Sequence, residues 1–112
     1  MTYQEIADML ASLKQNGLDV TYYSYPEEEA PPLPYCVYYY PSSDNFGADN
    51  KVYTHITALN IELYSENKSL ADEAKIESML ANYGFFWNKS ESYITSEKMY
   101  EVLYEMEVLI NG

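Results

Sequence analysis

The sequence contains no arginine and only six lysines, against eighteen aspartate and glutamate residues. The formal net charge of the 112-residue chain at pH 7 is therefore −12. Arginine is the side chain best suited to bidentate contacts with phosphates and base edges, so its absence disfavours nucleic-acid binding. An acidic surface also repels DNA and anionic membranes. We expect no specific nucleic-acid binding and no membrane binding, which leaves proteins or cations as the natural partners.

Cysteine, histidine and glycine are also scarce. Cys36 is the only cysteine, so no disulfide can form within the chain, and its apolar neighbours indicate a small buried side chain in a reducing compartment. His55 is the only histidine, and one cysteine with one histidine cannot make the usual zinc ligand sets within a single chain. The four glycines are not spaced to cradle a phosphate. We expect no metal site, no cofactor and no enzymatic activity.

No apolar run approaches membrane-spanning length, and the first residues lack a basic start followed by an apolar core. We expect a soluble protein that is intracellular where it is made. Hydrophobic residues nevertheless make up 47% of the chain, which is enough to order residues 1–112 as one domain despite the charge. Tyrosine accounts for 14 residues, and this side chain suits half-buried sheets and protein interfaces.

Two segments have the spacing of amphipathic helices. In each, apolar residues at i, i+3, i+4 and i+7 form one stripe: Ile6, Met9, Leu10 and Leu13, and then Ile76, Met79, Leu80 and Tyr83. The first helix is predicted over residues 3–16, between a capping box at Thr2 and a terminal Gly17. The second is predicted to begin after Ser69 and to end at Gly84.

Five segments are typical of β-strands: residues 18–25, 35–40, 51–66, 85–94 and 97–110. On the last strand, Glu101, Glu105 and Glu107 share one face, which we interpret as a solvated strand face and not as a catalytic carboxylate pair. The elements predict an α+β fold, with a mainly antiparallel or mixed sheet of about five strands and two helices on one face. The predicted order is α-β-β-β-α-β-β.

The strand predicted over residues 51–66 changes phase. Leu59, Ile61 and Leu63 share one face, whereas Val52, Ile56 and Ala58 share the other. Either a bulge near Thr57 restores the register, or the first half is buried on a different side, as in an arm that packs on a neighbouring subunit. The segment PEEEAPPLP (residues 26–34), which joins the first two predicted strands, is predicted to be an extended, solvated connection.

Residues 42–50, SSDNFGADN, separate two tyrosine-rich strands. From Asp44 onward the acids miss the positions that an EF-hand calcium loop requires. Asparagine, aspartate, serine and glycine all favour turns, so we interpret the segment as a solvated hairpin loop. Phe46 is the one large apolar residue in this segment, and it either folds back onto the base of the hairpin or inserts into a partner.

Three pieces of the sequence resemble one family: SSDNFGADNKVY (42–53), IELY (61–64) before a polar turn and helix, and SEKMYEVLYEMEV (96–108). From about Leu33 to Val108 the chain resembles small proteins of tailed phages and prophages of Gram-positive bacteria. These are described as tail-completion, tail-terminator or head–tail joining components. The resemblance is to the whole sequence and not to a catalytic signature. Tail terminator, head-completion adaptor and another minor tail protein all stay open.

The resemblance implies a non-enzymatic structural subunit with a tail-terminator-like α+β fold. Such subunits form a ring, commonly a hexamer, that caps the tail tube and offers a docking surface to the head connector. The implied partners are further copies of the chain, the major tail protein and head-connector proteins. The implied location is the host cytoplasm during assembly and then the virion tail or neck. Genomic DNA passes through such rings, and an acidic, arginine-free wall would let the duplex slide.

The predicted assembly contact is the arm from Tyr38 to Tyr53, because a closed ring needs two different surfaces on each subunit. The candidate interface residues are Tyr38, Tyr40, Asp44, Phe46, Asp49, Lys51 and Tyr53. The charge also motivates a rival hypothesis, an acidic inhibitor that mimics DNA and binds a nucleic-acid enzyme. Against the rival, the acids are spread over helix surfaces, one loop and one strand instead of one long face.

Overall fold

The computed structural model describes residues 1–26, 28–43, 45–48 and 51–111. Its elements follow the chain in this order: α1 Tyr3–Gln15, β1 Asp19–Tyr22, β2 Tyr35–Tyr39, β3 Phe46–Ala48, β4 Lys51–Ser65, α2 Leu70–Asn82, β5 Trp87–Ile94 and β6 Met99–Ile110. The predicted α+β class and the predicted order of helices and main strands are confirmed. The segment 42–50, predicted to be a loop, differs because it contains the short strand β3.

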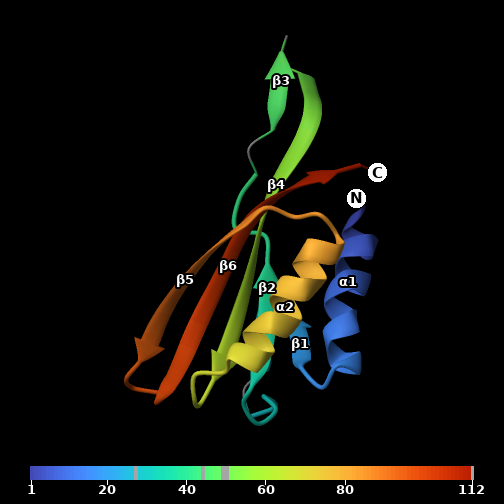
Figure 1. Ribbon diagram of the computed structural model, residues 1–112. Helices are drawn as coiled ribbons and strands as arrows, with labels where there is room; N and C mark the ends of the chain where they lie inside the picture. Colours follow the sequence, from blue (N-terminus) through green and yellow to red (C-terminus); the bar gives the residue numbers. More distant parts are fainter. Residues whose placement is uncertain (27, 44, 49–50, 112) are drawn as a thin grey trace.

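Five strands form a mixed sheet in the order β1-β2-β4-β6-β5, and β3 pairs with β4 outside this path (Figure 1). β1 and β2 run parallel, and the other neighbours run antiparallel. Parallel neighbours need a long crossover, and the proline-rich connection between Tyr22 and Tyr35 supplies it. β1 ends before the predicted residue 25 because Tyr23 has a φ of 68°, a left-handed conformation that takes the chain out of the strand.

The helix ends follow from their sequences. The Thr2 side chain accepts the Glu5 N–H and the Glu5 carboxylate accepts the Thr2 N–H, which is the predicted capping box. Ser69 caps α2 in the predicted position. Gly17 and Gly84 follow the helices with φ values of 84° and 75°, the left-handed conformation that glycine adopts without steric cost. Both helices therefore stop where the chain must turn back to the sheet.

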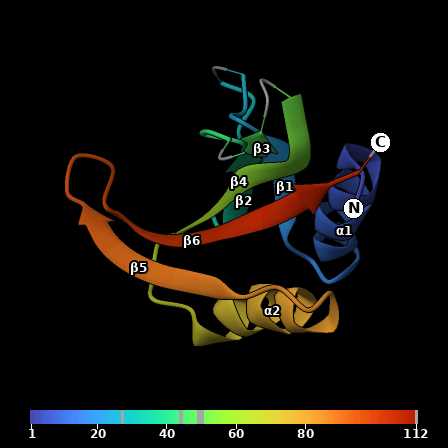
Figure 2. The same cartoon turned by 90° about the horizontal axis from the view of Figure 1, so that it is seen from above.

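One hydrophobic core contains buried residues of both helices and of the sheet. The buried stripes of α1 and α2 belong to the same cluster as alternate residues of the two central strands: Leu59, Ile61 and Leu63 of β4, and Val102, Tyr104, Met106 and Val108 of β6. The intervening residues point away from this core and are exposed or half-buried: Ala58, Asn60, Glu62 and Tyr64 of β4, and Glu101, Leu103, Glu105 and Glu107 of β6. We call this second surface the open face. Figure 2 shows the sheet from above, strongly twisted, with the two chain ends beside each other near α1, where the Asn111 N–H donates to the Met1 carbonyl oxygen at 2.8 Å.

β4 pairs with β6 in one unbroken register from His55↔Ile110 to Ser65↔Tyr100. A bulge near Thr57, one of the two predicted explanations for the phase change, is therefore wrong for this described stretch. The register shift lies instead in the β3–β4 pairing, where the step from Phe46 to Gly47 corresponds to two residues of β4. Ile56 and Ala58 lie on the open face and are half-buried there, which accounts for the apolar residues on the second side of the strand.

Before His55, β4 leaves the sheet and pairs with β3. Figure 1 shows these two strands projecting from the body as a hairpin, which we call the β3–β4 arm. The molecule is correspondingly elongated, with principal extents of 49 × 28 × 25 Å. One long strand thus belongs both to the core sheet and to a projection.

Glu73 of α2 is a buried carboxylate, only 2% exposed. Lys89 Nζ of β5 donates to its Oε1 at 3.1 Å. Its Oε2 accepts no well-directed hydrogen bond from the described residues, but the Lys68 ammonium lies 2.6 Å away and neutralises it. Glu77 accepts from Lys89 Nζ at 2.9 Å and from the Tyr104 hydroxyl at 2.8 Å. Burial alone would raise the pKa of Glu77, but the hydrogen bonds from Lys89 and Tyr104 outweigh it and hold this pKa below its usual value. A buried carboxylate is tolerated only when it is paired, so this network fastens α2 to β5 and β6.

Lys89→Met is expected to lower the free energy of unfolding by about 1–3 kcal/mol, because it removes the cation bonded to both Glu73 and Glu77. Lys75→Met is the matched control, since its side chain is 36% exposed against 34% for Lys89 but pairs with Asp72 on the same helix surface. The control should lose less than about 0.5 kcal/mol. Urea unfolding at pH 7, followed by circular dichroism, measures both. Equal losses would contradict the structural role of the network.

Candidate protein-binding surface

The β3–β4 arm leaves the body at a hydrogen-bonded root. The Ala58 N–H donates to the Ser42 carbonyl oxygen at 2.9 Å, and the Ile56 N–H donates to Asn45 Oδ1 at 3.1 Å. An isolated antiparallel bridge lies between these two bonds. Pairing therefore continues from the sheet to β3, and the arm extends β4 as an ordered hairpin with contacts along its base. Such a projecting hairpin offers backbone and side chains to another molecule.

Three of the seven predicted interface residues fall on this arm. Phe46 begins β3, Lys51 begins β4 and Tyr53 lies within β4, so the structure brings these three positions onto one hairpin. Their side chains lie outside the described part of the structure, and both predicted orientations of Phe46 stay predictions. Asp44 and Asp49 lie outside the described residues altogether.

The other two predicted residues, Tyr38 and Tyr40, meet two tyrosines that the sequence pattern does not single out. Tyr3 of α1 and Tyr22 of β1 join them in lining a hollow of about 410 Å³. The ring centroids of Tyr3 and Tyr40 are 5.0 Å apart, and those of Tyr22 and Tyr38 are 5.2 Å apart. Burial, more than the neighbouring tyrosines, raises the pKa of Tyr40. No local signal could have found Tyr22, because it meets Tyr38 only through the parallel pairing of β1 with β2.

A second group of tyrosines lies on the open face. The hydroxyls of Tyr39 and Tyr64 both donate to the Glu62 carboxylate, and the Asn60 amide donates to the Tyr39 hydroxyl at 3.4 Å. The ion pairs within the described residues involve other acids, so Glu62 is held by hydroxyl groups and not by a cation. Burial, and then the charge of Glu62, raises the pKa of Glu101. This face therefore carries negative charge that the described part of the chain does not neutralise.

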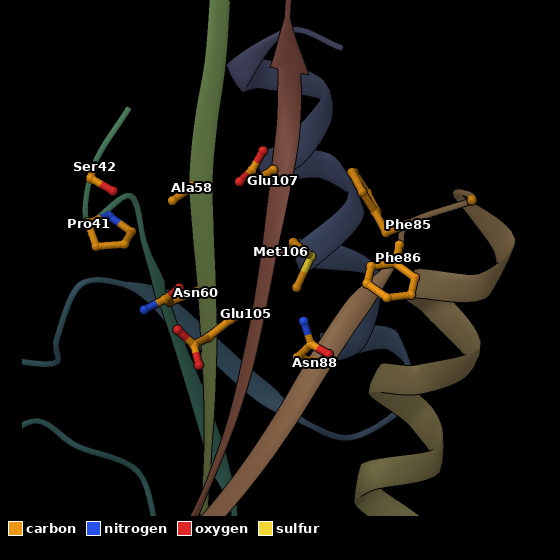
Figure 3. A pocket seen from close by; sticks show the side chains of 11 residues that line it. Pro41, Ser42, Ala58, Asn60, Phe85, Phe86, Asn88, Glu105, Met106 and Glu107 are labelled. Atoms are coloured by element: carbon orange, nitrogen blue, oxygen red, sulfur yellow. The ribbon is translucent and has the colours of Figure 1, made fainter. Parts of the chain in front are cut away.

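Figure 3 shows a hollow of about 680 Å³ on the open face, near the root of the arm. Pro41 and Ser42 lie beside β4, and Phe86 directly precedes β5 in the chain. The carboxylates of Glu105 and Glu107 extend from β6 between these two sides of the hollow. The Phe86 ring is 83% exposed. Aromatic side chains are enriched at protein interfaces, so this hollow with its exposed ring is a candidate contact surface.

The single cysteine, Cys36, lies in β2, and the single histidine, His55, lies in β4. Cys36 is fully buried, as predicted, and burial raises the pKa of its thiol, with a smaller contribution from Asp72. His55 is exposed at the root of the arm, in a hollow that it shares with Asn45 and Tyr3. Within the described residues, no three His, Cys, Asp or Glu side chains are grouped to hold a metal ion. Neither helix in this part of the chain has the length and apolar character needed to cross a membrane.

No protein-family model matches the chain, and no curated protein matches its sequence. Support for a function therefore comes from the surfaces described above and from the resemblance carried by the sequence itself.

Glu101→Gln removes the repulsion between Glu101 and Glu62 and is expected to raise the free energy of unfolding at pH 7. The gain should be less than about 1 kcal/mol, because the carboxylates of Glu101 and Glu62 both keep contact with water. A carboxyl whose pKa is raised on folding costs stability when it is ionised, and the cost disappears once the pH falls below its ordinary value near 4.5. The gain should thus be full at pH 7 and absent below about pH 4.5.

Glu105→Gln is the control, since it removes the same charge from an exposed position on the same strand. Urea unfolding of both variants at pH 7 and pH 4 makes the comparison. A loss of stability in Glu101→Gln, or an equal gain in Glu105→Gln, would show that Glu101 and Glu62 do not repel each other as described.

Proposed function

We propose that the chain is a non-enzymatic structural subunit of a tailed-phage virion, a tail-terminator or head–tail joining protein that assembles into a ring at the end of the tail tube. The observation that carries this proposal is the β3–β4 arm, a hairpin that extends the longest strand beyond the core. The resemblance of residues 33–108 to phage tail-completion proteins supports the same function.

A ring closes only if each subunit presents two different surfaces to its neighbours. The arm is one such surface. A second is available on the body, where the edge strands β1 and β5 each carry an exposed tyrosine, Tyr22 at 51% and Tyr93 at 49%. Tyrosine contributes large contact areas at low entropic cost, which suits subunit contacts. On this proposal the arm lies against the adjacent subunit or the tail tube.

The charge is consistent with the same function. The chain assembles in the host cytoplasm and then resides in the tail or neck, where the duplex passes through the ring. Because the sequence has no arginine and a net charge of −12, its surface repels phosphates and would not hold the passing DNA.

A second candidate function rests on the open face. Glu62, Glu101, Glu105 and Glu107 lie on neighbouring strands of this face, and the described residues provide them with no ion pair. A row of carboxylates could imitate the phosphates of a nucleic acid, as an inhibitor of a host enzyme would require. This candidate predicts a monomer that a DNA-binding enzyme captures, with DNA and salt competing for the capture.

Deletion of Phe46–Ala48 tests the main proposal. The deletion removes β3 but leaves the β4–β6 pairing and the core untouched, so circular dichroism and thermal unfolding should match those of the parent chain. Assembly into rings, at high concentration or on purified tail tubes, should be weakened. Light scattering after size exclusion measures ring formation, and negative-stain electron microscopy shows binding to tubes.

A variant with three extra residues in the exposed β4–α2 turn, between Glu66 and Asn67, serves as the control. It should assemble like the parent chain. Unchanged assembly of the deletion variant would rule out the arm as the contact. Failure of the parent chain to form rings or to bind tubes, together with DNA-competed capture by a host enzyme, would favour the inhibitor.

A further inference from the structure

The open face carries a second groove, of about 550 Å³, at the end of the sheet away from the arm. It crosses β2 and β4 between the β1–β2 connection and the β5–β6 turn. We call it the tyrosine groove, and the residues used below are Tyr23, Tyr25, Tyr35, Tyr39, Tyr64 and Glu62. All of them belong to the described part of the chain.

The tyrosine rings stand against one another at steep angles. Tyr25 and Tyr35 have centroids 5.1 Å apart with planes at 80°, and Tyr23 and Tyr39 have centroids 6.0 Å apart at 66°. Tyr35 and Tyr64 are 5.6 Å apart at 44°. Successive tilted rings leave ridges and slots between them. Grooves lined in this way by aromatic side chains suit proline-rich segments, which are already extended and lose little entropy on binding.

The polar part of the groove is acidic and fixed in position. The Tyr39 hydroxyl donates to Glu62 at 2.5 Å, and the Tyr64 hydroxyl donates to the other carboxylate oxygen. Glu101 lies close enough to Glu62 for its pKa to be raised by that charge as well as by burial. The ion pairs within the described residues leave both carboxylates without a cation. Charge complementarity therefore calls for a lysine or arginine from outside.

We propose that the tyrosine groove binds an extended, proline-containing segment of a partner protein, with a lysine or arginine of that segment placed on Glu62. The inference goes beyond the proposed function and does not depend on it. It also excludes one occupant, a second copy of the chain's own segment 26–34. That segment, PEEEAPPLP, has suitable prolines but three glutamates, which Glu62 and Glu101 would repel.

The sequence of segment 26–34 serves as the template for the peptides that test the proposal. The three synthetic peptides are PEEEAPPLP, its lysine counterpart PKKKAPPLP, and AKKKAAALA, which keeps the lysines and lacks proline. Titration calorimetry with the full chain at low salt should show binding of PKKKAPPLP. The glutamate peptide should not bind, and the proline-free peptide should bind at least about tenfold more weakly. Added salt should weaken the binding of PKKKAPPLP because its charged contact is partly exposed.

Two variants locate the contact. Glu62→Gln keeps the shape of the groove and removes its charge, and it should weaken PKKKAPPLP about tenfold. Glu107→Gln removes an equal charge from the same face but outside this groove, so it should change the affinity less than about twofold. Amide spectra by NMR show whether both variants are folded and which residues the peptide perturbs.

Three results would overturn the proposal. One is the absence of PKKKAPPLP binding at millimolar concentrations. Another is equal binding of the proline-free peptide, which would mean general attraction of cations. The last is equal weakening by the two glutamine substitutions, or NMR perturbations centred on the hollow of Figure 3 instead of on Tyr39 and Tyr64.

Discussion

The antiparallel pairing of β4 with β6 holds the rest of the molecule in place. Its unbroken register sends Leu59, Ile61 and Leu63 into the core and their neighbours to the open face. A shift by one residue would exchange the two faces, so this register determines both which side chains are buried and which acids and tyrosines are presented. The same strand continues past His55 into the β3–β4 arm, so that the position of the arm is fixed by the packing of the core.

The scarcity of cations gives the two sides of the sheet different characters. Lys68 and Lys89 lie on the core side, where they neutralise the buried Glu73. On the open face, Glu62 is held by tyrosine hydroxyls instead. Negative charge therefore accumulates where the chain is accessible, within an aromatic surface that can bury area on a partner. The proposed recognition of a basic segment follows from this unequal distribution.

The sequence predicted the features that depend on neighbours along the chain. The Thr2 capping box, the glycine ends of both helices and the alternation in β6 are local patterns, and all were found. The groups that needed distant partners were missed. Glu73 looks like any helix glutamate until α2 packs on β5, and the tyrosine groove exists only after β1, β2 and β4 are aligned. β3 was missed because it has only three residues and the polar residues before and after it in the sequence favour turns, whereas pairing with β4 decides its conformation.

We propose that the arm is the contact through which the protein assembles. Hydrogen exchange measured by mass spectrometry, on the free chain and on the chain bound to purified tail tubes, compares the arm with the core sheet. Amides of residues 46–54 should gain protection on assembly, while amides of residues 57–65, already paired in the sheet, should stay unchanged. Protection gained elsewhere on the surface, with no change in residues 46–54, would contradict it.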